Sequence, residues 1–320
     1  MLRTLELLAS DSSHLPLLTV FKESRVMEKY GFELELAIVG DTKAPTMAHR
    51  AKLVLAGEID FVSGLHHETY RARARGEKRL VYLAQAQNNW DDRLMAGPEI
   101  KSVPDLKGRK IICHTKAPCV AGNLGAVLET CGLKPDEIQI EASEVPSGKH
   151  LEFIERVCSG DAAAALVDMP FDLYGQKKGL HIVALPDRPV IHNTTLLATT
   201  DYIKANDGTV TSFLKGFIEA IHFFKTRPEE TTRILKTNLS KRYGLNEDEY
   251  YIHLQREWAT LLSKKPYPLP IAIQNVYDLD IGKDPAMKHI GPMETWDLHH
   301  LRAIDDSGFI DNLYASQPGR

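Results

Sequence analysis

The sequence predicts an α/β protein of two lobes that are joined by a hinge and followed by a helical C-terminal tail. Its 320 residues exceed the usual size of one domain. Patterns typical of strands and helices alternate along the chain, and the alternation starts again after about residue 100. After residue 199 only helical patterns follow. We therefore expect one lobe from residues 1–88 and 195–320 and a second lobe from residues 89–194.

The first lobe is predicted to begin with a strand, a polar turn and a helix. Leu2 to Leu8 has the apolar pattern of a short strand, and the segment from about Leu15 to Glu28 is predicted to be a helix that ends before Gly31. Alternating apolar positions, turn residues and helix caps predict the next elements. These are a strand over 33–39, a helix ending at 55, a strand over 59–63, a helix over 66–75 and a strand over 80–84 at the crossover between the lobes.

The second lobe repeats the alternation, and the tail is helical. We expect strands over 110–114, 138–140, 163–167 and 181–185, helices over 119–131 and 149–157, and a strand over 195–199 that returns to the first lobe. Helical patterns then cover 210–226, 228–239, 247–262 and 295–307. Because helices separate the strands, the sheets are predicted to be parallel, with helices on both faces.

Composition and charge limit the class of partner. Lys and Arg number 39 and Asp and Glu number 43, which gives a net charge of −4, and no long run of either sign occurs. This argues against a nucleic-acid partner and favours a small molecule. The four cysteines form no CxxC pair and have no zinc-like spacing, so we expect them to be reduced.

The sequence also bears on location. It contains no run of about 18 apolar residues, so membrane insertion is not expected. The first residues lack the pattern of a secretory signal, so the sequence as written predicts a cytoplasmic protein. Had a signal peptide been removed, the prediction would be a periplasmic one.

Three segments resemble the substrate-binding proteins for nitrate, sulfonates and taurine. The first is Lys52 to Phe61, a predicted helix followed by Ala-Gly, an acidic residue and the strand Ile-Asp-Phe. The second is Asp105 to Ile111, with the sequence DLKGRKI. The third is Cys158 to Pro170, a predicted turn and strand that end in an acidic residue near a proline. The resemblance covers roughly residues 1–240. It implies a type II periplasmic-binding-protein fold that closes on a small molecule by hinge motion. It also implies a homodimer or the permease of an ABC transporter as the protein partner.

The same superfamily contains cytoplasmic enzymes, including the thiamine-pyrimidine synthase and the dihydroxyphthalate decarboxylase. Gly64 stands at the position that matches the cofactor lysine of the synthase, and the cysteine-rich iron-binding stretch of that enzyme has no counterpart. The synthase activity is therefore disfavoured, and no cofactor is expected. A decarboxylase or lyase that acts on an aromatic or heterocyclic acid remains as the enzymatic alternative.

Polar residues follow the predicted strands, where ligands bind in open parallel α/β sheets. Five of the thirteen histidines lie in these loops, and histidine is a common ligand-binding and acid–base residue near neutral pH. The predicted ligand-binding residues are Ser13, His14, Thr42, His66, His67, Gln87, His114, Lys116, Asp168 and His192. If the protein is an enzyme, the catalytic residues are predicted to be His14, His66 and His114, and these three are expected to face a common cleft.

The chemistry of these loops favours an anionic ligand and no metal. Thr42 and Thr115 precede predicted helices, whose free N–H groups favour anions, and Lys43 and Lys116 would add positive charge. No HxH or HExxH spacing occurs, and adjacent helical histidines point about 100° apart, so we expect no metal site. The sequence thus predicts binding of a sulfonate, carboxylate or heterocyclic acid, with the enzyme on the same fold as the alternative.

Overall fold

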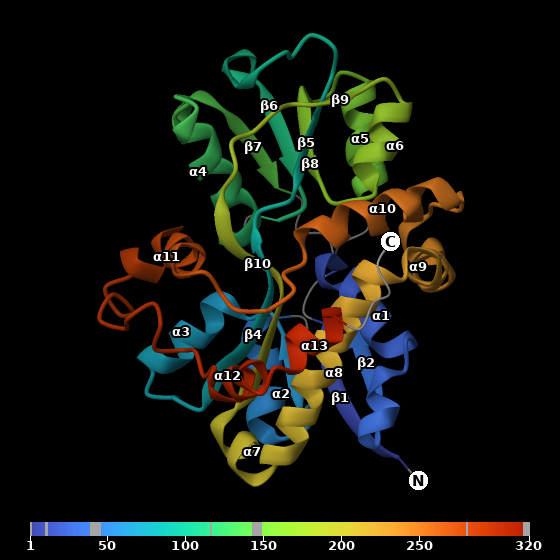
Figure 1. The fold of residues 1–320 in the computed structure, drawn as a ribbon. Coiled ribbons are helices and arrows are strands. Elements are labelled where there is room, and N and C mark those ends of the chain that lie inside the picture. Colours follow the sequence, from blue (N-terminus) through green and yellow to red (C-terminus); the bar gives the residue numbers. More distant parts are fainter. Residues whose placement is uncertain are drawn as a thin grey trace.

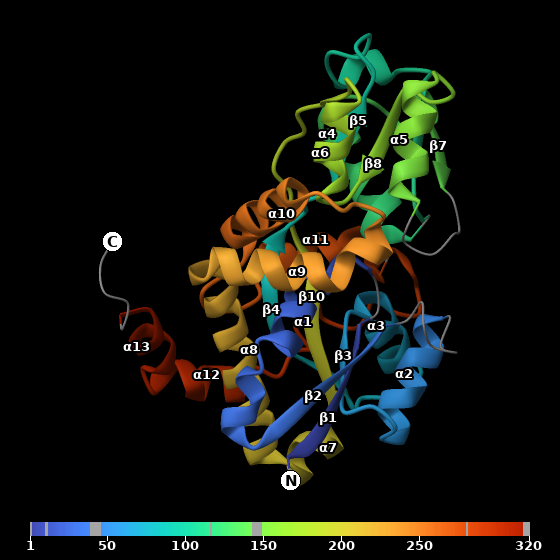
Figure 2. The ribbon, with the colours of Figure 1, turned by 90° about the vertical axis from the view of Figure 1, so that its right-hand side faces the viewer.

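The computed structural model describes residues 2–9, 12–38, 46–115, 117–142, 149–279 and 281–315. Within these residues the strands form two five-stranded sheets, and each sheet is covered by helices (Figures 1 and 2). The chain passes between the sheets after β4 and again before β10. The α/β class, the two lobes and the helical tail predicted from the sequence are confirmed.

In the first sheet, successive apolar side chains of a strand point to opposite faces, and helices cover both faces. Its strands, in order across the sheet, are β2 (Phe32–Ile38), β1 (Arg3–Ala9), β3 (Phe61–Ser63), β10 (Pro189–Thr199) and β4 (Leu80–Asn89). Leu5 and Leu7 of β1 belong to the core beneath α1 (Leu15–Glu23), whereas Leu8 faces the core beneath α2 (Met47–Ala56) and α3 (His66–Ala74). The two-residue period of a strand thus explains why both faces are apolar.

The second sheet is built in the same way. Its order is β7 (Gln139–Ala142), β6 (Lys110–Cys113), β8 (Ala164–Val167), β5 (Arg93–Ala96) and β9 (His181–Ile182). Ile111 of β6 packs towards α4 (Asn123–Thr130), and Ile112 packs towards α5 (His150–Cys158) and α6 (Phe171–Lys177). Both sheets therefore sit between helices, as the sequence predicts.

The prediction of wholly parallel sheets is wrong for the strands next to the hinge. β1, β2 and β3 run parallel, as do β6, β7 and β8, but β10 runs antiparallel to β3 and β4, and β5 runs antiparallel to β8 and β9. β5 and β10 enter their sheets directly from the other lobe, without a crossover helix, so they need not follow the direction that a βαβ unit imposes.

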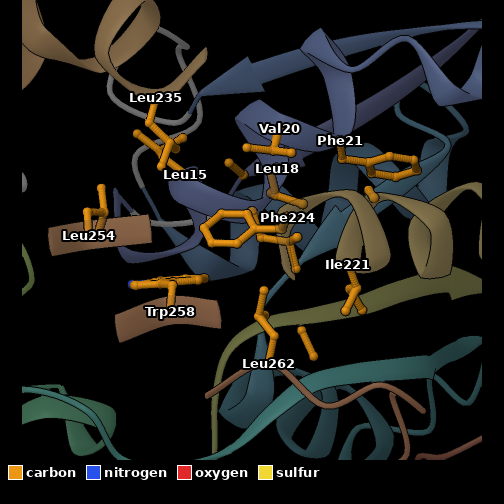
Figure 3. Packing of buried hydrophobic residues seen from close by; sticks show 14 of the residues in the cluster. Leu15, Leu18, Val20, Phe21, Ile221, Phe224, Leu235, Leu254, Trp258 and Leu262 are labelled. Carbon is orange, nitrogen blue, oxygen red and sulfur yellow. The ribbon is translucent and has the colours of Figure 1, made fainter. Parts of the chain in front are cut away.

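The tail packs on the first lobe and also reaches the second. It comprises α7 (Thr200–Ala205), α8 (Asp207–Thr226), α9 (Pro228–Tyr243), α10 (Asp248–Leu261), α11 (Pro270–Leu279), α12 (His299–Asp306) and α13 (Phe309–Ala315). Phe224 of α8, Leu235 of α9 and Trp258 of α10 gather around α1 (Figure 3). The α10 residue His253 donates from Nε2 to both carboxylate oxygens of Asp172 in α6, at 2.9 and 3.0 Å. None of the helices in the described ranges is both long and apolar enough to cross a membrane.

Several boundaries differ from the sequence prediction. The first helix ends at Glu23 rather than Glu28, because Arg25 takes a left-handed backbone (φ 57°) before a 3-10 turn over Val26–Tyr30. The helix expected over 119–131 begins as a π-helical turn, Pro118–Gly122, before α4. The last long helix begins at His299 instead of residue 295. β5, α6, α11 and α13 were not anticipated.

Candidate functional site

Residues from both lobes and from the hinge strands surround two adjoining hollows. The imidazole hollow is partly open to solvent and has about 560 Å3 of free space, lined by Ser13, His14, Met47, Gly64, Leu65, His66, His67, Asp92, His114, Cys119, Val120, Asp168, His192 and Asn193. The aromatic hollow is also partly open and has about 470 Å3 of free space, lined by Ser13, Pro16, Asp91, Asp92, His150, Asp168, Met169, Phe171, Asn193, Arg242, Tyr243 and Trp258. Four residues line both hollows, so we treat the two as one interlobe cavity.

The strand directions explain why residues far apart in the sequence meet here. His14 and His66 follow the carboxyl ends of the parallel strands β1 and β3. His114 and Asp168 follow the carboxyl ends of the parallel strands β6 and β8 in the other sheet. Carboxyl ends of parallel strands share one edge of a sheet, and here the two edges face each other across the cavity.

The hydrogen bonds around His66 fix its tautomer. The Gln85 Nε2 atom donates to the backbone oxygens of Gln87, His192 and Asn193, the last two at 2.8 and 3.2 Å, so the amide oxygen of Gln85 must face Thr195. The Thr195 hydroxyl donates to that oxygen and can only accept from His66 Nε2, 2.5 Å away. His66 therefore carries its proton on Nε2, which leaves Nδ1 with a free lone pair.

Two histidines of the cavity are held in opposite protonation states. Desolvation lowers the pKa of His66 well below its usual value, and neighbouring histidines lower it further. Burial alone would also lower the pKa of His192, but Asp92 and Asp91 raise it well above its usual value. Their carboxylate oxygens lie 3.3 and 3.0 Å from His192 Nε2. At neutral pH the cavity thus holds a neutral His66 and a buried imidazolium at His192.

The two aspartates beside His192 are not equivalent. Asp91 Oδ1 accepts hydrogen bonds from Gln87 Nε2 at 3.3 Å and from Asn193 Nδ2 at 3.2 Å, in addition to its contact with His192. Burial raises the pKa of Asp92 above its usual range, and the nearby carboxylates add to this although His192 opposes it. A single imidazolium cannot fully compensate two buried carboxylates.

His114, His150 and Asp168 form a second polar group in the wall. His150 Nε2 lies 3.4 Å from Asp168 Oδ2, and the rings of His114 and His150 are 5.6 Å apart. Burial would raise the pKa of Asp168, but His150, His114 and His192 together hold it well below its usual range. Asp168 is therefore ionised at neutral pH.

Three groups in the described ranges bring together side chains that could ligate a metal ion. These are His114 with His150 and Asp168, His192 with Asp91 and Asp92, and, on the surface, Asp207 with His299 and His300. The residues do not fit the cofactor and iron site of the thiamine-pyrimidine synthase. Gly64 in the cavity wall offers no amine, and the four cysteines form no disulfide and come from separate parts of the second lobe.

Most of the residues predicted from the sequence lie around the cavity. Those that line it are Ser13, His14, His66, His67, His114, Asp168 and His192. Gln87 does not line either hollow: it is fully buried behind the wall, where it supports Asp91. Thr42 and Lys116 lie outside the described residues, as does Lys43. The roles of all these residues in binding or catalysis remain predictions.

Sequence reasoning missed several residues of the wall, namely Asp91, Asp92, His150, Phe171, Asn193, Arg242, Tyr243 and Trp258. His150 could have been found, because it follows the strand predicted over 138–140 just as His114 follows its own strand. Asp91 and Asp92 lie between β4 and β5, directly in the crossover. Arg242, Tyr243 and Trp258 come from tail helices, which carry no local sign of a site.

Comparison with protein families gives one match. The family model described as NMT1/THI5 like matches residues 32–231. Among curated proteins, no sequence matches the chain.

Solved structures match the chain over nearly its whole length. The periplasmic aliphatic sulphonate binding protein SsuA from Escherichia coli is 18% identical, with a TM-score of 0.67 over 92% of this chain and 99% of that one. The periplasmic nitrate-binding protein NrtA from Synechocystis PCC 6803 is 14% identical, with a TM-score of 0.68 over 100% and 92%. A mutant of DSZB in complex with biphenyl-2-sulfinic acid is 13% identical, with a TM-score of 0.67 over 96% and 100%. These likenesses confirm the periplasmic-binding-protein fold.

Proposed function

We propose, from the premise that this chain belongs to the NMT1/THI5-like family, that it binds a small organic acid with an aromatic or heterocyclic ring in the interlobe cavity. The observation that carries the proposal is the arrangement of the two hollows. Histidines from separate segments face one hollow, and Phe171, Tyr243 and Trp258 line the adjoining one. A pocket with apolar walls and a few convergent polar groups is the usual form of a small-molecule site.

The two hollows suit the two parts of such a ligand. The ring would lie against the aromatic side chains, which offer apolar area and stacking. The acid group would accept hydrogen bonds from Ser13, with the imidazolium of His192 and the guanidinium of Arg242 as charged donors.

The fold neighbours support an acidic ligand. Their names or bound ligands are aliphatic sulphonates, nitrate and biphenyl-2-sulfinic acid, all of which are oxyanions when ionised. The third of these also carries aromatic rings. We carry over the class of ligand only, because identities of 13 to 18% support a shared fold and no more.

A second candidate function, an enzyme acting on the same class of acid, is favoured by the protonation states of His66 and His192. Groups whose environments push their pKa values apart are typical of acid–base pairs in enzymes. Neutral His66, with its free Nδ1 lone pair, would be the base, and the imidazolium of His192 would be the acid or electrostatic stabiliser. The reaction class would be decarboxylation or another lyase reaction.

The two functions imply different surroundings for the protein. A binding protein of this fold would act in the periplasm and deliver its ligand to the permease of an ABC transporter. An enzyme would act in the cytoplasm, with dimerisation as the expected association. The chemical fate of the ligand therefore decides the location and the partner together.

Native mass spectrometry of the freshly purified protein should identify the ligand, followed by calorimetric titration of aromatic carboxylates, heterocyclic carboxylates and sulfonates. Arg242→Met should weaken binding of the acid about 10- to 100-fold, which corresponds to the loss of one hydrogen bond to a charged group. His289→Ala is the matched control, because His289 is exposed and does not line the cavity. Equal affinities of the two variants, or no binding of any acid, would overturn the proposal.

Incubation of the wild-type protein with the bound acid separates the two functions. An unchanged ligand supports the binding function. A converted ligand supports the enzyme, and His66→Ala should then lower turnover about 10²- to 10⁴-fold with a smaller change in affinity.

A further inference from the structure

We propose that His114, His150 and Asp168 form a site for a divalent transition-metal ion, with an open coordination position that faces the interlobe cavity. The proposal goes beyond acid binding, because the site is defined by these three side chains alone. It assigns a role to His150, which neither candidate function uses.

The spacing of the ligand atoms is compatible with a shared metal ion. One ligand atom from each of the three residues lies within 4.8 Å of the other two. His150 Nε2 and Asp168 Oδ2 are 3.4 Å apart, beyond the range of about 2.7–3.2 Å for N–H···O hydrogen bonds. Two ligands at about 2.0–2.1 Å from a tetrahedral ion are themselves about 3.4 Å apart.

His150 supplies a second and independent observation. Only 2% of the residue is exposed, and neither ring nitrogen makes a hydrogen bond within the described part of the chain. Phe171 stacks on the imidazole at 4.7 Å with an interplanar angle of 28°, which fixes the plane of the ring. A buried imidazole that is held in place without a hydrogen-bond partner is a group that a ligand would complete.

The fold explains why no sequence motif marks the site. His114 and Asp168 directly follow the neighbouring parallel strands β6 and β8, and His150 begins the helix α5 that packs on β8. All three ligands thus lie in the second lobe, at or directly beside the ends of regular elements. A site on such elements is held more precisely than one on loops.

The ligand set selects the class of metal. Two imidazoles and one carboxylate, with a further position open, are typical of catalytic Zn²⁺ sites and of non-haem Fe²⁺ sites. Mg²⁺ and Ca²⁺ prefer all-oxygen surroundings, so they should bind poorly here. Zn²⁺ is the appropriate probe, because it has no redox chemistry of its own.

Because the cavity wall is acidic, a bound metal ion would change how strongly the wall attracts an anionic ligand. Asp91, Asp92 and Asp168 contribute three carboxyl groups, whereas Arg242 is the one residue with a permanent positive charge among the described lining residues. A divalent ion at the site would turn an acidic wall into one that attracts an organic acid, and its open position would take an acid oxygen. This consequence, unlike the metal site itself, rests on the proposed function.

The other two groups with ligating side chains define the controls. His192 is an imidazolium between Asp91 and Asp92 and is not available as a neutral ligand. The surface group contains exposed His299, whose side chain is 59% exposed, and could bind added metal weakly. His299→Ala therefore serves as the background for every titration.

The experiment is a calorimetric titration of Zn²⁺ alone into EDTA-treated His299→Ala protein, without any organic acid. One Zn²⁺ per chain should bind, and Mg²⁺ should not compete. Adding His150→Ala, or Asp168→Asn where the first variant unfolds, should weaken binding at least about 100-fold, whereas adding His289→Ala should change nothing. Thermal unfolding confirms that each variant is folded.

The metal site is wrong if the His299→Ala protein takes up no Zn²⁺, or if both His150→Ala and Asp168→Asn bind as tightly as their parent. Because the acid is absent, neither result bears on the proposed function. Repeating the acid titration with Zn²⁺ and with EDTA then tests the bridging role: equal affinities would refute it and leave the metal site standing.

Discussion

Replacing Thr195 by valine should destabilise the protein by about 1–2 kcal/mol, because the hydroxyl of Thr195 links two other polar side chains. The substitution removes the donor to Gln85 Oε1 and the acceptor of His66 Nε2 at the same time. Gln85 is fully buried, so its oxygen cannot turn to water, and an unsatisfied buried group costs about 1–3 kcal/mol. His66 is partly exposed to the cavity and can be rehydrated, and the added methyl group returns about 0.8 kcal/mol.

The neighbouring Thr194 provides the matched control. It is fully buried in the same strand, and its hydroxyl has no hydrogen-bond partner within the described ranges. Thr194→Val should therefore leave the free energy of unfolding unchanged or raise it by up to about 1 kcal/mol. Urea unfolding of the two variants and the wild type measures the difference, and NMR of the imidazole nitrogens should show that His66 loses its preference for the Nε2–H tautomer in Thr195→Val. Equal unfolding midpoints for the two variants would refute the assignment of the hydrogen bonds.

Two further predictions concern charged groups. Since the folded-state pKa of His192 is raised, its stabilisation is complete below about pH 6.5 and is lost as the pH rises towards that pKa, by about 1.4 kcal/mol per unit. His192→Gln should lack this slope when urea unfolding is followed from about pH 6 to 9, and parallel curves would contradict the prediction. Lys225 donates to the carbonyl oxygens of Ala259 and Leu262, the latter at 2.9 Å, at the end of α10. Lys225→Met keeps the aliphatic stem and should lower the free energy of unfolding by about 1–2 kcal/mol; an unchanged urea midpoint would show that these bonds contribute nothing net.

The fold could be predicted from the sequence where local patterns determine it. The alternating apolar residues of β1 and the glycine that ends α2 are local signals, and they gave the first strands and helices nearly in place. The first part of β10 was missed because it carries polar residues, and β5 because it is short and directly follows Asp91 and Asp92, which pair with His192 at the crossover. Such pairing depends on residues about 100 positions apart and leaves no periodic pattern in either segment.

The candidate site could be predicted in part for a similar reason. The rule that ligands bind at the carboxyl ends of parallel strands places His14, His66 and His114 correctly at the cavity, although it says nothing of what they do there. Gln87 does not line the wall because β4 continues to Asn89 instead of ending at residue 84, so Gln87 lies within the strand and is buried instead of following the strand in a loop. Trp258 could not be found at all, since only the folding of the tail back across α6 brings it to the cavity.

The cavity is lined by residues from both lobes and from the hinge, and a bound ligand would therefore affect the equilibrium between open and closed forms. His14 and His66 belong to the first lobe, His114 and Asp168 to the second, and His192 to the hinge strand β10. A ligand that contacts both lobes binds the closed form more tightly than any open one, and so it must shift the population towards closure. The imidazolium of His192 keeps both of its carboxylate partners within the crossover, so its charge does not depend on closure. The protonation state of His192 is therefore set before the ligand arrives, whereas the distance from His66 to His114 and Asp168 across the cavity depends on closure.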